Sequence, residues 1–333
     1  MRYHQGTTII ETKVNFSHLS PLLHRSPFVP IKPIGHVAIS EPPKTSRSSN
    51  NKLGIAYMAG GMFLFAAVDT IAKFLTETLH PLQIVWSRQT GLLLGILVIL
   101  AFRGFTILRT QHLGLQVARG AMAVGSASIF IYAVSFVSLV DATAVTFVAP
   151  FMVTLIAALV LREPVGIRRW TAVAIGFVGV LIVTRPGMGV VHPAVLLVLI
   201  AALLFALRQI VSRVVAGTDR IITTVAYTAL VGSAIITVPL PFVWRTPETS
   251  FEVALLVSIA LISAVAETLV IKALDVADAV VVAPVHYSII IWATFYGFMV
   301  FDQLPDMWTW VGASIIVVMG MYTLYREWRV KSG

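Results

Sequence analysis

Two related stretches of the sequence place ionisable residues inside apolar runs. The first, LFAAVDTIAKFL at residues 64–75, contains Asp69 and Lys73, and the second, LFALRQIVSRVV at residues 204–215, contains Arg208 and Arg213. A charge at the centre of a membrane helix costs about 2.5–3.5 kcal/mol, so it persists where it pairs, faces a wet cavity or reaches the interface. The two stretches therefore indicate polar groups inside a lipid-embedded protein.

The first stretch can form an ion-pair cluster. Asp69 and Lys73 lie four residues apart on one helical face, so they can pair, and Arg88 in the next apolar run can join them. Lys73 and Arg213 lie near the ends of their runs, and two interpretations stay open for both: extension to the interface, or a role in function. Asp69 lies deeper and is harder to explain by extension.

A second group of charges lies in the opposite half of the membrane. Glu267 is the sole acid of the second-half runs away from their ends, and Arg119 and Arg208 enter the same half. We expect Glu267 to pair with one of these arginines, either as a structural pair or as a pair that opens when a substrate arrives. His286 is the only histidine deep in a run, where packing is the more frequent role.

Aromatic residues away from the membrane interfaces complete the candidate site. Their flat rings can stack on a planar heterocycle or simply fill space. The full set of predicted substrate-binding residues is Asp69, Lys73, Trp86, Arg88, Arg119, Arg208, Tyr227, Glu267, His286 and Trp292.

Composition excludes an ordinary water-soluble domain. The 333-residue chain is 58% hydrophobic and 12% charged, whereas soluble domains carry about 25% charged residues. It has no cysteine, so disulfides and thiolate metal sites are excluded, and we expect neither a metal nor a cofactor. The net charge of +9 lies mainly in short loops between apolar runs, which favours membrane orientation over nucleic-acid binding.

The apolar runs predict an all-α membrane protein with ten spans. Residues 1–51 contain no run that could cross a bilayer and are expected to be a disordered tail, or an artefact of an upstream start codon. A tight turn near Asp141 is expected between the third and fourth spans. The spans are expected near 53–76, 82–102, 113–138, 140–161, 168–185, 193–215, 221–243, 251–272, 279–300 and 307–326.

The chain repeats itself with opposite membrane orientation. A shift of 140 residues brings Leu64-Phe65-Ala66 onto Leu204-Phe205-Ala206, and Ala149-Pro150 matches Ala283-Pro284 at a slightly different shift. The expected repeats, 53–186 and 193–327, hold five spans each, so the second enters the membrane from the other side. Inverted repeats and matched helix breaks, here at Pro150 and Pro284, are typical of secondary transporters and point to the binding site.

Two segments resemble a known family. LREPVGIRRWTAVAIGFVGVLIVTRPG (161–187) and FDQLPDMWTWVGASIIVVMGMY (301–322) resemble the two EamA repeats of the drug/metabolite transporter superfamily. The resemblance implies a ten-helix secondary transporter of the bacterial inner membrane with a central cavity between the repeats. The family's glutamate after the fourth span is Glu163 in the first half, but Gln303 stands at that place in the second. Around VDTIAK and VWSRQTGLLLG the sequence is most similar to the branch with riboflavin importers and S-adenosylmethionine uptake carriers.

These observations predict a transporter of a small metabolite, working by alternating access. The resemblance and the buried aromatic residues favour riboflavin uptake, with a flavin as the partner molecule. The alternatives are efflux of amino acids, drugs or other metabolites, and S-adenosylmethionine uptake. An intramembrane enzyme ranks last, because the motifs of hydrolases, metalloproteases and phosphate-binding loops are missing. The lysine and arginine bias places both termini in the cytoplasm, and the protein is expected to be a monomer or homodimer.

Overall fold

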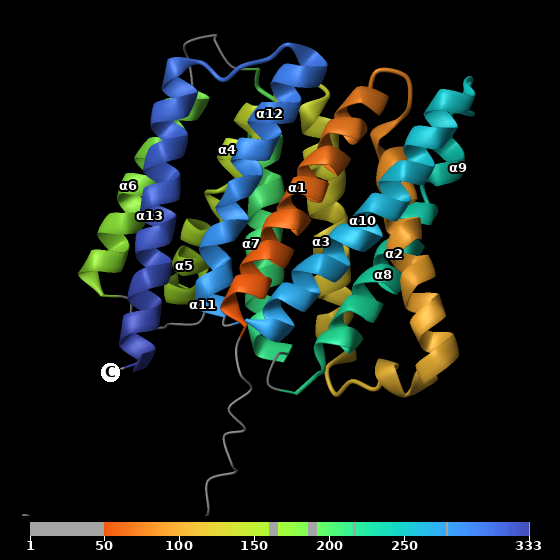
Figure 1. The fold of residues 1–333 in the computed structure, drawn as a ribbon, viewed down its shortest axis with the longest axis horizontal. Coiled ribbons are helices and arrows are strands. Elements are labelled where there is room, and N and C mark those ends of the chain that lie inside the picture. The colour runs from red at the N-terminus through yellow and green to blue at the C-terminus, as the bar shows by residue number, and fades with distance from the viewer. Residues whose placement is uncertain (1–49, 160–165, 186–191, 216–217, 278, 333) are drawn as a thin grey trace, which may run out of the picture. The chain divides into compact units, whose positions relative to one another are not determined.

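The computed structural model describes residues 50–332 except 160–165, 186–191, 216–217 and 278. All regular elements in these residues are helices, and no strand occurs among them, as the predicted all-α class requires. The predicted tail lies outside the described residues except for its last two positions. The helices (Figure 1) are α1 (Asn51–Leu75), α2 (Pro81–Arg103), η1 (Phe105–Leu108), α3 (Leu113–Val134), α4 (Leu139–Thr146), α5 (Ala149–Leu159), α6 (Ile167–Thr184), α7 (Val195–Val215), α8 (Ile221–Thr237), α9 (Leu240–Val243), α10 (Ser250–Val276), α11 (Ala279–Val282), η2 (Ala283–Ser288), α12 (Ile289–Phe301) and α13 (Met307–Ser332).

Seven helical segments of the described chain are long and apolar enough to cross a membrane. Three shorter apolar helices fall where the fifth, seventh and tenth spans were predicted: Trp170–Thr184, Ile221–Thr237 and Met307–Thr323. The seven longer segments are Asn51–Leu75, Pro81–Arg103, Leu113–Val134, Leu139–Leu159, Val195–Val215, Ser250–Val276 and Ala283–Phe301.

Local sequence signals set the helix ends. The side chain of Asn50 accepts from the N–H of Leu53 at the start of α1, and Thr249 and Glu252 form a reciprocal capping box at the start of α10. The turn predicted near Asp141 lies earlier, at 135–138. Asp141 instead belongs to the first turn of α4, because the Ser138 side chain caps that helix by accepting from the Asp141 N–H.

Both prolines of the repeated Ala-Pro pair lie at helix interruptions. Between α4 and α5 the helix breaks at residues 147–148, and Pro150 is the second residue of α5. Between α11 and α12 the chain tightens into the 3-10 helix η2, which contains Pro284. Proline lacks the N–H that would continue the α-helical hydrogen bonding, so each break follows from the sequence.

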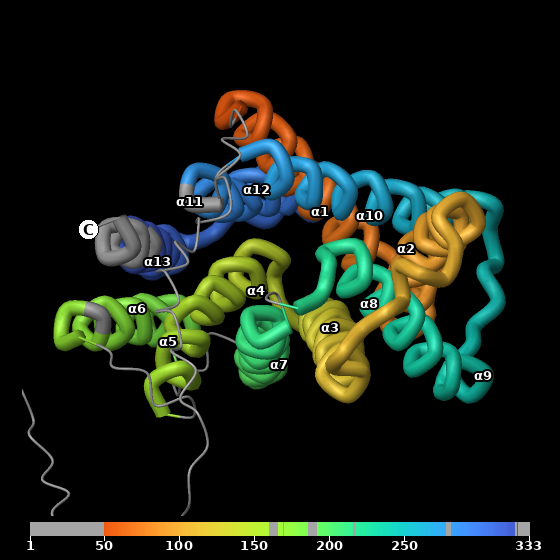
Figure 2. Tube along the Cα trace, turned by 90° about the horizontal axis from the view of Figure 1, so that it is seen from below, coloured from red at the N-terminus to blue at the C-terminus, as the bar shows by residue number. Residues whose placement is uncertain are grey.

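The helices pack as two bundles with matching internal pairings (Figure 2). In the α1 bundle, α1 packs on α10 and α12, and α2 packs on α10. In the α7 bundle, α7 packs on α3 and on α4–α5, and α8 packs on α3. The two bundles meet where α2 packs on α8 and α12 on α4, while α6 packs on α13. Each of these pairings in one bundle therefore has a counterpart in the other.

Small residues allow the closest helix approaches. A Cβ added to Gly91 on α2 would lie 1.9 Å from the Ala260 carbonyl oxygen on α10, so only glycine fits there. At the α6–α13 contact the relation is reciprocal: a Cβ on Gly179 would lie 2.9 Å from the Gly312 oxygen, and one on Gly312 would lie 2.6 Å from the Gly179 oxygen. A Cβ added to Gly95, four residues further along α2, would meet nothing within 4 Å.

The two ends of the bundles are called the Asn50 side and the Thr76 side, after the residues that flank α1. On the Asn50 side, the N–H of Asn50 donates to the Val276 carbonyl at 2.9 Å, where α10 ends. On the Thr76 side, Gln83 Nε2 donates to the Arg245 carbonyl at 2.8 Å, and Arg185 pairs with Asp306 at 2.6 Å. Burial alone would raise the pKa of Asp306, but hydrogen bonds from Thr309 and Arg185 hold it below its ordinary value.

Candidate functional site between the two bundles

Asp69 pairs with Arg88 rather than with Lys73. Arg88 on α2 reaches Asp69 on α1 at 3.6 Å, and its guanidinium lies over the Phe65 ring at 5.3 Å from the centroid. The two side chains are 15% and 21% exposed, so the pair is largely removed from solvent. The predicted contact of Asp69 with Arg88 is therefore formed, within the α1 bundle.

Lys73 extends away from Asp69 toward the Thr76 side, so the predicted ion pair within the helix is wrong. Its Nζ donates to the Val137 carbonyl at 2.6 Å and to Gln303 Oε1 at 3.3 Å. The long apolar stem lets the amine reach these oxygens at the end of the bundle. No sequence pattern marks the Val137 carbonyl, because a backbone acceptor can belong to any residue type.

Arg119 is bound by hydroxyl and carbonyl groups instead of by Glu267. Its Nε donates to Ser212 Oγ at 2.7 Å on α7, and NH1 donates to the Thr224 carbonyl at 3.3 Å and to the Thr228 hydroxyl on α8. All these partners belong to the α7 bundle. The predicted direct pair between Arg119 and Glu267 is therefore wrong, because nearby neutral acceptors satisfy the guanidinium.

Arg208 of the α7 bundle and Glu267 of the α1 bundle interact electrostatically. The Arg208 guanidinium lies over the Phe205 ring at 4.7 Å, and its buried Nε has no hydrogen-bond partner. Glu267, half-buried on α10, interacts electrostatically with both Arg208 and Arg119. Within the described part of the chain, however, its carboxylate forms no hydrogen bond and no ion pair within 4 Å. The predicted Glu267–Arg208 ion pair is therefore not formed.

Other buried polar atoms also lack partners near these elements. Among the described residues they include Ser263 Oγ on α10, Ser288 Oγ at the end of η2 and Trp292 Nε1 on α12. A buried polar group without a partner costs about 1–3 kcal/mol, so such groups mark places where a ligand can supply the missing bond. The two serines were not predicted, since serine is common in membrane helices and carries no charge signal.

The remaining predicted binding residues are His286 and three aromatic side chains. His286 lies on η2 with its side chain exposed, within electrostatic reach of Arg208. Trp86 and Tyr227 instead tie helices together: Trp86 Nε1 donates to Thr237 Oγ1 at 3.2 Å, and the Tyr227 hydroxyl donates to the Leu108 carbonyl at 3.0 Å. Trp292 meets the Phe63 ring edge to face at 5.0 Å.

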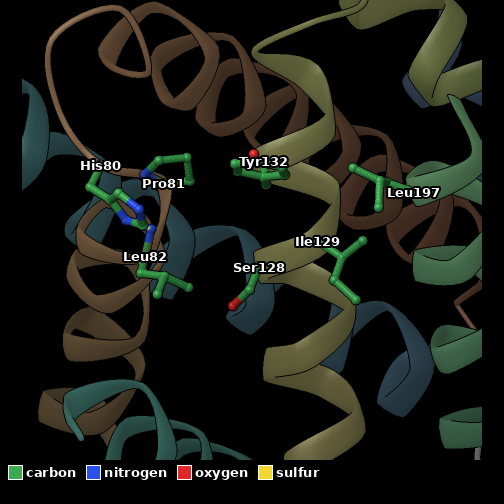
Figure 3. A pocket seen from close by; sticks show the side chains of 7 residues that line it. All are labelled: His80, Pro81, Leu82, Ser128, Ile129, Tyr132 and Leu197. Atoms are coloured by element: carbon green, nitrogen blue, oxygen red, sulfur yellow. Dashed lines mark hydrogen bonds between the residues drawn. The ribbon is translucent and has the colours of Figure 1, made fainter. Parts of the chain in front are cut away.

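A separate apolar cavity of about 240 Å³ opens on the Thr76 side (Figure 3). Burial, with a smaller contribution from Arg245, lowers the pKa of His80 below its ordinary value, and the neutral Nδ1 accepts from the Leu82 N–H at 3.3 Å. The cavity contains none of the predicted binding residues, and its surface is largely apolar. Its lining residues are His80, Pro81, Leu82, Ser128, Ile129, Tyr132 and Leu197.

Comparison with characterised proteins gives relatives of nearly full length. The S-adenosylmethionine uptake transporter of Rickettsia bellii is 26% identical over 281 residues, covering 84% of this chain and 96% of that protein. The riboflavin transporter of Vibrio cholerae is 28% identical over 283 residues, covering 84% and 94%. The pseudopaline exporter CntI of Pseudomonas aeruginosa is 24% identical over 271 residues, covering 80% and 94%.

Structural comparison and the family model agree on the architecture. A solved structure, described only as a crystal structure of a protein, superposes with a TM-score of 0.57 at 15% identity, covering 86% of this chain and 99% of that one. The model of the EamA-like transporter family matches residues 52–185 and again residues 192–325. The chain is thus a multi-pass membrane protein with two EamA repeats, and it belongs to the EamA-like transporter family of the drug/metabolite transporter superfamily.

Proposed function

We propose that the protein is a secondary transporter that carries a small metabolite across the bacterial inner membrane by alternating access. Ten spans in two inverted five-helix repeats would provide the machinery. The matched helix pairings of the α1 and α7 bundles support this, because a repeat with five passes starts its successor on the opposite side. The proposed substrate site is the contact between the bundles, where Arg208 and Glu267 interact electrostatically.

The observation that carries the proposal is the separated pair of Glu267 and Arg208. Glu267 belongs to the α1 bundle and Arg208 to the α7 bundle, and each keeps hydrogen-bonding capacity unused among the described residues. A charged group in a membrane interior is costly unless a partner or water accompanies it. A substrate that binds both groups would therefore join the two bundles and relieve this cost.

Charges of opposite sign suit a substrate with both an ammonium and a carboxylate group. S-adenosylmethionine has both groups, a sulfonium cation and an adenine ring, so we place it first among substrates. Riboflavin, favoured by the sequence interpretation, is uncharged but planar, and the rings of Phe205, Phe65 and Trp292 support it as the second candidate. Relatives named for each of these two substrates match the chain at similar identity.

Uptake into proteoliposomes that contain only this protein tests the function. We expect time-dependent, saturable accumulation of labelled S-adenosylmethionine, and competition by excess unlabelled compound. Riboflavin uptake without S-adenosylmethionine uptake would reverse the order of the substrates. If neither compound enters, outward movement should be measured from preloaded vesicles, and no movement of either in both directions would reject both substrates.

We also propose that the Asn50 side faces the cytoplasm, with both termini inside. The lysine and arginine bias of the loops supports this orientation. Reporter fusions after residues 187 and 333 should then read outside and inside, respectively. Two reporters on the same side would contradict the model of ten inverted spans.

A further inference from the structure

The contacts of Lys73 join the two bundles on the Thr76 side. Lys73 belongs to α1, whereas the Val137 carbonyl that accepts from it at 2.6 Å follows α3 in the α7 bundle. Asp141, in the first turn of α4, acts on the charge of Lys73 and is itself fixed by hydrogen bonds from Ser138 at 2.6 Å and Thr309 at 2.8 Å. One lysine therefore bridges the bundles at this end.

The turn after α12 holds the second acceptor of Lys73 in place. Asp302 adopts a left-handed conformation with φ of 51°, its N–H donates to Phe298, and the Gln303 N–H donates to Gly297 at 3.1 Å. This pattern ends the helix and fixes Gln303 next to Lys73. The Phe301 ring, 5.1 Å from the amine, covers it further, so the amine is directed across the gap between the bundles.

The repeat carries a counterpart of this arrangement at the opposite end. The shift that matches the two Leu-Phe-Ala stretches brings Arg213 onto Lys73. The alignment that matches Ala283-Pro284 to Ala149-Pro150 brings Asp275 onto Asp141. Arg213 lies in the last turn of α7, and Asp275 lies in the last turn of α10. The cation and the acid are again divided between the bundles, now on the Asn50 side.

This second contact is not made in the structure. The side chains of Arg213 and Asp275 are both exposed, and neither has a hydrogen bond or ion pair in the part of the chain that the structure describes. On that side Gln116 of α3 donates to Asp219 beyond α7 at 2.6 Å, a contact that stays within the α7 bundle. The bundles are therefore bridged by a cation at one end and lack the equivalent bridge at the other.

We propose that Arg213 and Asp275 form an ion pair that closes the Asn50 side in the opposite transport state, while the Lys73 contacts open. The inference rests on the proposed alternating-access function. The inverted repeat would then contain two gates, each with a cation on one bundle and an acid on the other. The Lys73 gate is closed in this structure, and the Arg213–Asp275 gate is open. A bundle rotation that separates Lys73 from Val137 would bring the last turns of α7 and α10 together.

Cysteine cross-linking tests the second gate without any assumption about substrate. The protein contains no cysteine, so Arg213→Cys with Asp275→Cys introduces a single pair. We expect a short bis-maleimide to cross-link this pair in native membranes. The matched control joins Arg213→Cys to Leu274→Cys, whose side chain is exposed beside Asp275 but points to another face. No cross-link in the first pair, or equal yields in both pairs, would overturn the proposal.

Charge reversal tests whether the two charges act together in transport. Arg213→Asp and Asp275→Arg should each slow uptake roughly fivefold or more, the lower end of typical coupling between states. The double reversal should recover most of the rate, because it restores the attraction. Arg220→Asp, exposed at the same end, controls for the general loss of positive charge and should leave uptake near wild type. A double variant no faster than the slower single variant would contradict the gate. Cross-linking remains decisive if neither candidate substrate is carried.

Discussion

The α1 bundle and the α7 bundle share their helix pairings but differ in their charges. The α1 bundle contains the acids Asp69 and Glu267, and its Arg88 is bound by a carboxylate. The α7 bundle contributes two arginines to the central region: Arg119 is bound by neutral oxygens, and Arg208 keeps an unpaired Nε. Packing symmetry and charge asymmetry therefore coexist in one duplicated fold.

The helix pairings and the charged groups serve different requirements. In the proposed transport cycle, matched helix pairings would allow the two bundles to exchange roles between states, and this exchange depends on shape. A metabolite is not symmetric, so the groups that recognise it need not be duplicated. At the proposed site, the acid on one bundle and the arginine on the other would give a substrate one fixed orientation.

The largest expected effect comes from removing the acid on the α1 bundle side of the site. Glu267→Gln should lower the initial uptake rate, normalised to membrane protein level, by about tenfold or more, because the lost charge corresponds to about 1.4 kcal/mol or more of binding. Glu267→Asp should keep part of the rate. Glu252→Gln on the same helix is the matched control, since that acid lies at the start of α10 and is held by Thr78 and by the N–H groups of Glu248 and Thr249. A wild-type rate in Glu267→Gln would assign Glu267 to packing.

A second substitution in Glu267→Gln sharpens the contrast between the two arginines. Adding Arg208→Gln should recover membrane insertion and thermal stability but not transport, because it removes the cation left without its acid. Adding Arg119→Gln should not recover stability, since the Ser212 and Thr228 hydroxyls already satisfy that arginine. Equal recovery by both substitutions would show that Arg119 depends on Glu267 after all. Thermal unfolding in detergent measures the difference.

The ion pair of the α1 bundle should matter for stability. Asp69→Asn leaves Arg88 largely buried without its carboxylate, which should cost about 3 kcal/mol of unfolding free energy. Arg88→Gln added to Asp69→Asn should restore much of the loss. Lys73→Gln added instead should restore none, because Lys73 contacts Val137 and Gln303. Recovery by the Lys73 substitution would mean that Lys73 and Asp69 interact.

The neutral contacts of the α7 bundle predict a smaller effect. Ser212→Ala removes one of the acceptors of Arg119 and should destabilise the protein by about 1–3 kcal/mol. In Arg119→Gln the same serine substitution should cost less, since the bond that it removes is already lost. Additive losses would show that Ser212 acts independently of Arg119. Urea-dependent unfolding of the four proteins gives the comparison.

The smallest effect concerns acid stability on the Asn50 side. Burial alone would raise the pKa of Asp219. Hydrogen bonds from Thr110 and Gln116 and the charge of His112 nevertheless hold this pKa below its ordinary value. A depressed folded pKa stabilises the protein above the unfolded pKa, and this stability is lost as the pH falls through the folded value. Asp219→Asn should therefore reduce the fall in melting temperature on acidification. An unchanged pH dependence would mean that Asp219 does not contribute.

The membrane class, the helical character of the spans, the repeat and the broken helices could be predicted from the sequence alone. These follow from run length, from residues matched at a fixed shift, and from the missing proline N–H, all of which are local properties. The presence of charges inside the membrane was equally visible. The Asp69–Arg88 contact could also be predicted from the sequence, because both residues lie in neighbouring apolar runs near the same membrane surface.

The partners of these charges, in contrast, depend on how the helices pack in three dimensions. Lys73 binds a backbone carbonyl 64 residues away, and Arg119 binds hydroxyls more than 90 residues away, acceptors that no charge pattern marks. Helical periodicity tells which residues share a face, but not which other helix lies opposite that face. The separation of Glu267 from its expected partners depends on the packing of α10 against α1 and of α7 against α3. Pairing in a membrane protein is therefore a property of the bundle, because neutral oxygens compete with acids for every buried cation.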